Sequence, residues 1–277
     1  MAGSVEYKAI LTPEQVLELV IRPLERAAVA AEAADVVHIT SNKARFPIIT
    51  ADPSAEWVPE GGKIPISNGT ATELTVEPAK LAVLSTITNE LRDDSSPAAT
   101  DAIGEGLLRD AARKLDQAWL SAPVTNGPAE TLASVTGVNT IPVSGALSSL
   151  DAFTDAAAAI EDHGSVTDWI MAKADVVRLA KLRKSTGSNE GLLSVDPTQP
   201  SRRMIEGARI HISPYATEGT IYGVDKSQVK TVIREDATVE TSDQFLFDTD
   251  STALRLIMRA AFGFPNPGAV SKIVVSA

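Results

Sequence analysis

The chain has 277 residues, of which 44% are hydrophobic, contains no cysteine and carries a formal net charge of −11. Its apolar content is sufficient for a folded core in one or two domains, and the lack of cysteine excludes disulfides and thiolate metal sites. The negative charge opposes binding to phosphate backbones, and no apolar run or basic leader predicts a membrane span or a signal peptide.

Residues 1–50 are predicted to form an N-terminal arm that lies along other elements. The segment Thr12–Gln15 is a capping box with proline in the first helical turn, so a short helix is expected to begin there. An alanine-rich segment, 26–37, has helical character, whereas residues 45–49 favour an extended chain.

The stretch from Trp57 to Asp94 predicts a long two-stranded ribbon. Its first turn, Pro59–Lys63, contains adjacent glycines, which permit positive φ, and residues 72–77 then alternate apolar with polar side chains. The alternation changes phase at 78–80, which predicts a bulge. Because an isolated hairpin is only marginally stable in water, this ribbon needs a third strand or a neighbouring molecule.

A long amphipathic helix follows the ribbon. Ser96 and Pro97 provide its start, and it extends for roughly 25 residues, or about 37 Å. Its predicted buried stripe recurs every four residues and comprises Ile103, Leu107, Ala111, Leu115 and Trp119.

The remaining chain predicts a small α/β block followed by strands. Helices are expected at 151–162 and 175–184 around a buried strand at 167–172, and a loop at 185–203 is rich in Gly, Ser, Asn and Pro. Further strands are predicted at 208–213, 220–224, 229–234, 238–241 and 254–264, the last with apolar side chains at every even position.

Residues that could carry chemistry have a simpler structural interpretation. The three histidines, His38, His163 and His211, lack metal-ligand spacing, and Asp93–Asp94 before a helix start is typical of a solvated cap. Gly61–Lys63 lacks the full spacing of a phosphate-binding loop. We therefore expect no catalytic residue, metal or cofactor.

The order of these elements resembles the tailed-phage major capsid protein of the Hong Kong 97 fold. The resemblance rests on the following segments: the Trp57–Gly61 motif, Arg92–Asp94 before the long helix, Trp169–Met171, Arg234–Glu240 and Asn266–Pro267. They keep their order over nearly the whole chain.

This resemblance implies an α+β fold with a defined domain organisation. It comprises an N-terminal arm (1–50), an extended β-hairpin loop over an adjacent subunit (51–88), a peripheral domain with the spine helix (89–125 and 228–267), and an α/β axial domain (126–227 and 268–277). The loop at 185–203 would approach the centre of each pentamer or hexamer.

The resemblance also implies a function. The chain is expected to be a major head protein that forms pentamers and hexamers, and these close an icosahedral shell around double-stranded DNA without sequence-specific binding. Expected partners are further copies, a separate scaffolding protein, a portal and a decoration protein, with assembly in the bacterial host cytoplasm. The alternatives are an encapsulin compartment that encloses cargo enzymes, and a soluble hydrolase using Asp93 or Asp94.

Candidate contacts between subunits are Trp57, Glu60, Gly61, Gly62, Lys63, Arg92 and Asp93. A solvated charge is the simpler expectation for the four ionisable members. Trp57 could pack either at the base of its own ribbon or under a neighbouring copy. A covalent cross-link like that of the founding member is not expected, because Lys63 is only near the required place and the final strand reads Asp250–Thr252 where a partner residue would stand.

Overall fold

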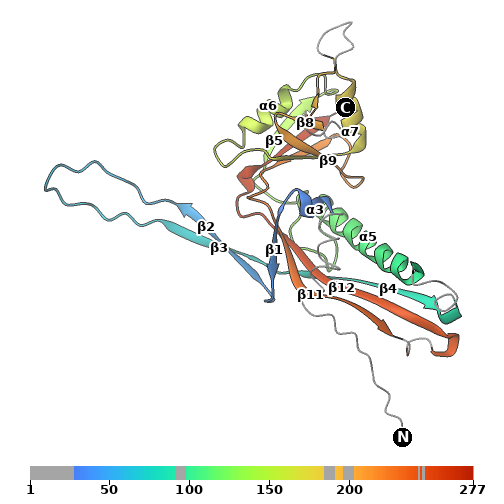
Figure 1. The fold of residues 1–277 in the computed structure, drawn as a ribbon. Coiled ribbons are helices and arrows are strands. Elements are labelled where there is room, and N and C mark those ends of the chain that lie inside the picture. Colours follow the sequence, from blue (N-terminus) through green and yellow to red (C-terminus); the bar gives the residue numbers. More distant parts are fainter. Residues whose placement is uncertain are drawn as a thin grey trace.

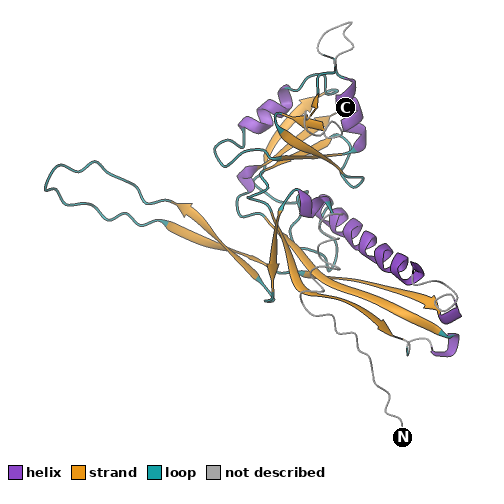
Figure 2. Ribbon diagram, viewed as in Figure 1, coloured by secondary structure: helices purple, strands orange, loops and turns teal. Residues whose placement is uncertain are grey.

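The computed structural model describes residues 28–90, 98–183, 191–195, 203–242, 244 and 247–276. It has three parts: an elongated sheet beneath a long helix, a more compact α/β domain above, and a narrow ribbon that leaves the body (Figures 1 and 2). The predicted helix at Thr12, Arg92, Asp93 and most of the 185–203 loop lie outside the described residues. No described helix has the length and apolarity needed to cross a membrane.

The elongated sheet has four strands in the order β1-β11-β12-β4. These are β1 (Asp35–Ile39), β11 (Lys230–Ser242), β12 (Ser251–Gly263) and β4 (Ala79–Thr88). Strand β1 is parallel to β11, and the other pairs are antiparallel. The two strands predicted at 229–234 and 238–241 are one strand, because β11 continues through a register shift between Arg234 and Thr238.

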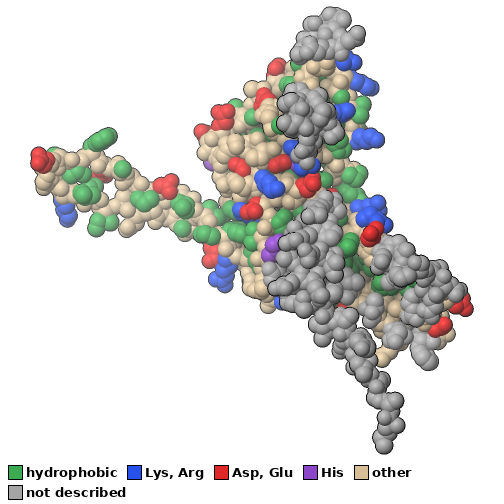
Figure 3. Space-filling view, in the orientation of Figure 1, with side chains coloured by type: hydrophobic (Ala, Val, Ile, Leu, Met, Phe, Trp, Pro, Cys, Tyr) green, Lys and Arg blue, Asp and Glu red, His purple; other side chains and the backbone are tan. Residues whose placement is uncertain are grey.

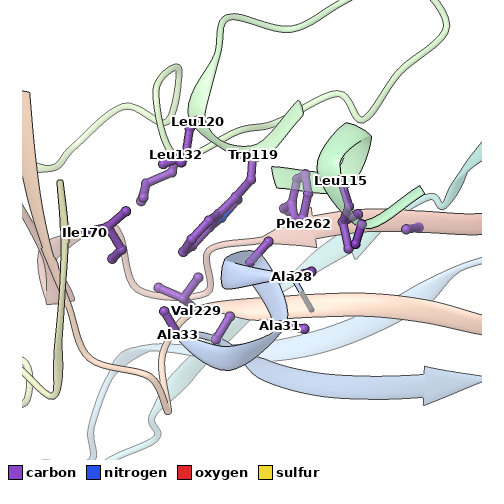
Figure 4. Packing of buried hydrophobic residues seen from close by; sticks show 14 of the residues in the cluster. Ala28, Ala31, Ala33, Leu115, Trp119, Leu120, Leu132, Ile170, Val229 and Phe262 are labelled. Atoms are coloured by element: carbon purple, nitrogen blue, oxygen red, sulfur yellow. The ribbon is translucent and has the colours of Figure 1, made fainter. Parts of the chain in front are cut away.

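The long helix, α5 (Ala98–Leu120), packs across this sheet as the apolar stripe predicted. Leu107, Ala111, Leu115 and Trp119 are all buried, whereas the side chain of Ile103 is outside the description. The Trp119 ring lies 6.3 Å from that of Phe262 on β12 (Figure 4). A stripe that recurs every fourth residue therefore covers the buried even positions of β12.

The alanine-rich segment contains a short helix and a strand rather than one longer helix. Helix α3 spans only Val29–Glu32, and the chain then enters β1. Its alanines are buried, and their small side chains let the backbone come close to α5: the Ala30 N–H donates to Asp116 at 2.8 Å. Burial raises the pKa of this Asp116 carboxyl, and the bonds from the α3 backbone only partly oppose that effect.

The upper domain is built on a seven-stranded sheet in the order β5-β13-β10-β6-β9-β8-β7. Its strands are β5 (Asn139–Ser144), β6 (Asp168–Met171), β7 (Ser194–Val195), β8 (Arg203–Ile205), β9 (Ala208–Ile212), β10 (Thr220–Val224) and β13 (Val270–Ser276). Strands β6, β9 and β10 were predicted from the sequence. Strands β5 and β13 were not predicted. Strand β13 comes after β12, where the chain returns from the lower sheet to the upper domain.

Helices α6 (Asp151–Ala158) and α7 (Lys173–Lys181) share one apolar cluster on this sheet, with Trp169 at its centre. The Trp169 ring is fully buried and meets Phe153 of α6 edge-on at 5.0 Å. A Cβ at Gly223 would lie 2.5 Å from the same ring, so the neighbouring strand needs glycine at this position. Both helices therefore cover the same face of the sheet.

A buried polar cluster joins the upper domain to α3. His211 is 2% exposed in its side chain, and its two ring nitrogens lie 2.7 Å from Asp168 and 3.4 Å from Glu32. Arg209 also donates to Glu32, at 3.2 Å. Burial opposes ionisation of Asp168, but hydrogen bonds from His211 and Thr167 hold the pKa of its carboxyl below the ordinary value.

This lowered pKa predicts an acid-dependent loss of stability. The folded state binds fewer protons at Asp168 than the unfolded state, so the stabilisation is present at neutral pH and is lost as pH falls below about 4. Asp168→Asn should lower the free energy of unfolding at pH 7 by about 1–3 kcal/mol. Denaturant unfolding should show this difference shrinking at about pH 3. The control Asp155→Asn, at an exposed position, should change little at either pH.

Candidate assembly interface

The ribbon consists of β2 (Ala44–Ala51) and β3 (Thr70–Val76), paired antiparallel and joined by residues 52–69. The first strand of the ribbon is β2, so the extended chain expected at 45–49 is confirmed, although this segment had been assigned to the N-terminal arm. Strand β4, which had been assigned to the extended loop, pairs with β12 in the body.

The change of apolar phase near Pro78 marks a break between two strands instead of a bulge. Strand β3 ends at Val76, and β4 begins at Ala79 in a different sheet. Within β4, the odd positions face inward and the even positions are exposed, as the sequence predicted. The two intervening residues therefore let the chain leave the ribbon and join the body.

The outer turn depends on its glycines. Gly61 adopts φ of +74°, and the Gly62 N–H donates to the carbonyl of Pro59 at 2.9 Å. A Cβ at Gly62 would lie 2.8 Å from Val58 Cγ1 and 2.9 Å from the Pro59 carbonyl oxygen. Larger residues would therefore strain or open the turn.

Polar pairs hold the ribbon in shape along its length. Arg45 lies 3.3 Å from Glu73 across the two strands, and the hydroxyls of Thr50 and Thr70 are 2.8 Å apart. Further out, the Ser54 N–H donates to the Ser67 hydroxyl at 2.8 Å. At the root, buried residues of both strands pack on β11 and β12. The ribbon is thus anchored at one end only.

The outer part of the ribbon exposes large apolar side chains. Trp57 is 104% exposed, Ile66 89% and Ile64 76%, and green side chains are visible along this projection in Figure 3. Trp57 therefore does not pack at the base of its own ribbon, which was one of the two predicted alternatives. Glu60 and Lys63 are exposed beside it.

The exposed area of the whole subunit agrees with an extended shape. A compact chain of 29.1 kDa would expose roughly 11,000 Å². This chain exposes 16,545 Å². The excess over the compact value was predicted from the sequence, and it leaves surface that association between copies could bury.

A mainly apolar groove of about 270 Å³ lies between the end of α5 and the start of β4. Leu81, Leu115 and Val124 line it, with Lys80 and Lys114 at its sides. None of its described lining residues is an acid or a histidine that could serve as a general acid or base. Among the described residues, no cluster of three potential metal ligands occurs either.

A family model described as the phage capsid family matches residues 8–275. The chain belongs to this family. It is a major capsid protein, a structural component of the virion shell and not an enzyme, as the sequence predicted. A comparison with curated proteins finds no match.

Solved structures from phages and from a GTA particle share the fold. A chain from Microbacterium phage Oxtober96 is 21% identical, with a TM-score of 0.73 and coverage of 90% of this chain and 91% of that one. A chain from Mycobacterium phage Bobi is 22% identical, with a TM-score of 0.71 and coverage of 90% of this chain and 91% of that one. The capsid of a native GTA particle is 15% identical, with a TM-score of 0.72 and coverage of 91% of each chain.

All the candidate contact residues within the described part lie on the ribbon. Trp57, Glu60, Gly61, Gly62 and Lys63 lie together around its outer turn, and all are exposed. The sequence did not single out Ile64 and Ile66, although apolar side chains two apart after a glycine turn could have indicated them.

The exposed apolar side chains predict a specific effect of Trp57→Ala. Because this side chain contacts solvent only, the free energy of unfolding should change by less than about 0.5 kcal/mol. Assembly should weaken, since a tryptophan buried at an interface commonly contributes about 2 kcal/mol or more. Thermal unfolding and light scattering at several protein concentrations measure the two effects. Equal assembly of mutant and wild type would place Trp57 outside the contact.

Proposed function

We propose that the ribbon, residues 44–76, lies over an adjacent copy, and that this contact links subunits in the shell. The observation that carries the proposal is the complete exposure of Trp57 on a ribbon anchored at one end only. Isolated β-ribbons gain stability when another surface covers them. A second copy provides that surface at every position of a closed assembly.

The copies are proposed to form pentamers and hexamers of an icosahedral shell. The GTA capsid similar to this chain was computed with C5 symmetry, which supports five-fold rings as one arrangement. The domain division that the resemblance implied is proposed with two changes: β4 belongs to the peripheral domain and β2 to the extended loop. Many weak contacts around such rings together make a stable container.

The proposed content of the shell is double-stranded DNA. The formal charge of −11 disfavours tight binding of phosphate and suits a container that encloses its genome without reading sequence. A separate scaffolding protein, a portal and a decoration protein are the proposed partners during assembly in the host cytoplasm. The match to the phage capsid family and the similarity to a phage structure and a GTA capsid favour this content over the cargo enzymes of an encapsulin.

Electron microscopy of the purified full-length chain tests this function. Rings of five and six copies are the expected result for the chain alone, and closed shells are expected when the scaffolding protein is present. A chain that stays monomeric, or forms only a small closed oligomer, under both conditions would overturn the proposal. Neighbouring genes distinguish a shell that encloses DNA from one that encloses cargo enzymes. Portal, terminase and protease genes are expected, and a gene for a cargo protein with a docking tail would favour the encapsulin.

A further inference from the structure

The two helices of the upper domain carry opposite charges. From residue 151 to 166 the sequence has no Lys or Arg, and its four acids are exposed: Asp151, Asp155, Glu161 and Asp162. We call these four residues the acidic face. Helix α7 has the opposite character, because its one acid, Asp175, is fully buried while its lysines are exposed.

The exposed lysines of α7 lie near uncovered apolar side chains. Lys173 and Val177 line a groove of about 510 Å³ with Ile212 of β9. Val177 is 41% exposed and Ile212 48%. We call Lys173, Lys181, Val177 and Ile212 the basic face. Its mixed character is typical of a protein interface, with an apolar centre and charged surroundings.

Several charged side chains of the two faces have no ion-pair partner within their own subunit. Within the described part of the chain, Asp155, Glu161, Lys173 and Lys181 form no ion pair. Arg178 differs, because it is held by Asp175 at 3.2 Å and by Glu218. The charges of these four side chains are therefore available to pair with another molecule.

The two faces cannot meet within one subunit. Helix α6 packs over β5 and β13 at one edge of the sheet, whereas α7 follows β6 and shares a groove with β8 and β9, nearer the other edge. Figure 1 shows α6 and α7 on opposite sides of the upper domain. In the same orientation, acids gather on the α6 side and basic side chains on the α7 side (Figure 3).

We infer that the basic face of one copy docks against the acidic face of the next copy around a ring. The inference rests on the proposed function and names the contact that forms its pentamers and hexamers. Two different patches joined head to tail generate a closed ring when the rotation between copies is suitable. Opposite charges would also select this orientation, because like faces repel one another.

Charge reversal on each face tests the contact. The basic-face variant is Lys173→Glu with Lys181→Glu, and the acidic-face variant is Asp155→Lys with Glu161→Lys. All four positions are exposed, so circular dichroism and thermal unfolding should match the wild type. Native mass spectrometry should show that each variant alone needs roughly ten-fold or more protein to form rings. The control Lys173→Arg with Lys181→Arg should form rings as the wild type does.

Combining the variants gives the decisive results. A chain with all four reversals has complementary faces again, so it should form rings of five and six at wild-type concentrations. An equal mixture of the two double variants can close a ring only by alternation. It should therefore give even-numbered rings, with six copies, and no rings of five. Wild-type rings should weaken as salt rises.

Two outcomes would overturn the inference: a basic-face variant that forms rings at wild-type concentration, or a folded four-reversal chain that forms none. Either outcome leaves the proposed function intact as long as the wild type assembles. If the wild type itself forms no ring or shell, the proposed function fails with it.

Discussion

Leu107→Asp is expected to abolish folding of the subunit. Leu107 is 7% exposed and packs with Ile87 of β4 and Leu254 of β12 in an apolar cluster. A carboxylate there would be buried without a partner, which we expect to cost about 4 kcal/mol or more. Total stabilities are about 5–15 kcal/mol, so most of the protein should be insoluble or unfolded.

The matched control is Leu107→Met, which conserves volume and should cost less than about 1.5 kcal/mol. Expression in soluble form and denaturant unfolding measure both variants. A Leu107→Asp chain within about 1 kcal/mol of the wild type would show that α5 does not cover the sheet at this position.

Shortening the ribbon should separate folding from assembly. Ala51 and Thr70 are partners across the two strands, so an Asn-Gly pair in place of residues 52–69 can close them with a two-residue turn. The removed side chains are exposed or, for a few residues, half-buried, and the melting temperature should be nearly unchanged. Assembly should require about 100-fold more protein or fail, because each copy loses its reach over a neighbour.

A second variant distinguishes length from side-chain chemistry. A full-length ribbon carrying Trp57→Ser, Ile64→Ser and Ile66→Ser keeps its backbone but loses its apolar surface. It should assemble almost as poorly as the shortened chain. Normal shells from the shortened chain, seen by electron microscopy, would contradict a linking role for the ribbon.

The elements predicted correctly have a strong local pattern. The four-residue stripe of α5 and the even-numbered apolar positions of β12 each identify an element without knowledge of its partner. The missed strands depend on distant pairing. Strand β1 lies parallel to β11, with Asp35 opposite Lys230, and a short strand of this kind has no signal in its own neighbourhood. Strand β5 contains Pro142, which is tolerated because β5 is the edge of its sheet.

The position of the candidate assembly interface in the chain was predictable from the sequence, but the exposure of its Trp57 side chain was not. The glycine turn and the alternation after it indicated a ribbon around Gly61 and Gly62 from sequence alone. Whether Trp57 packs on its own ribbon depends on the path of β2, which pairs with β3 much nearer the body. The unpaired charges on α6 and α7 had no sequence signal, because their meaning depends on where the two helices lie on the sheet, toward opposite sides of the upper domain.

A cryo-EM reconstruction of assembled particles would show directly where the ribbon lies. We expect residues 52–69 to lie over a neighbouring copy, with Trp57 buried between the two subunits. A reconstruction in which the ribbon folds back on its own subunit, or in which Trp57 remains in solvent, would contradict this expectation.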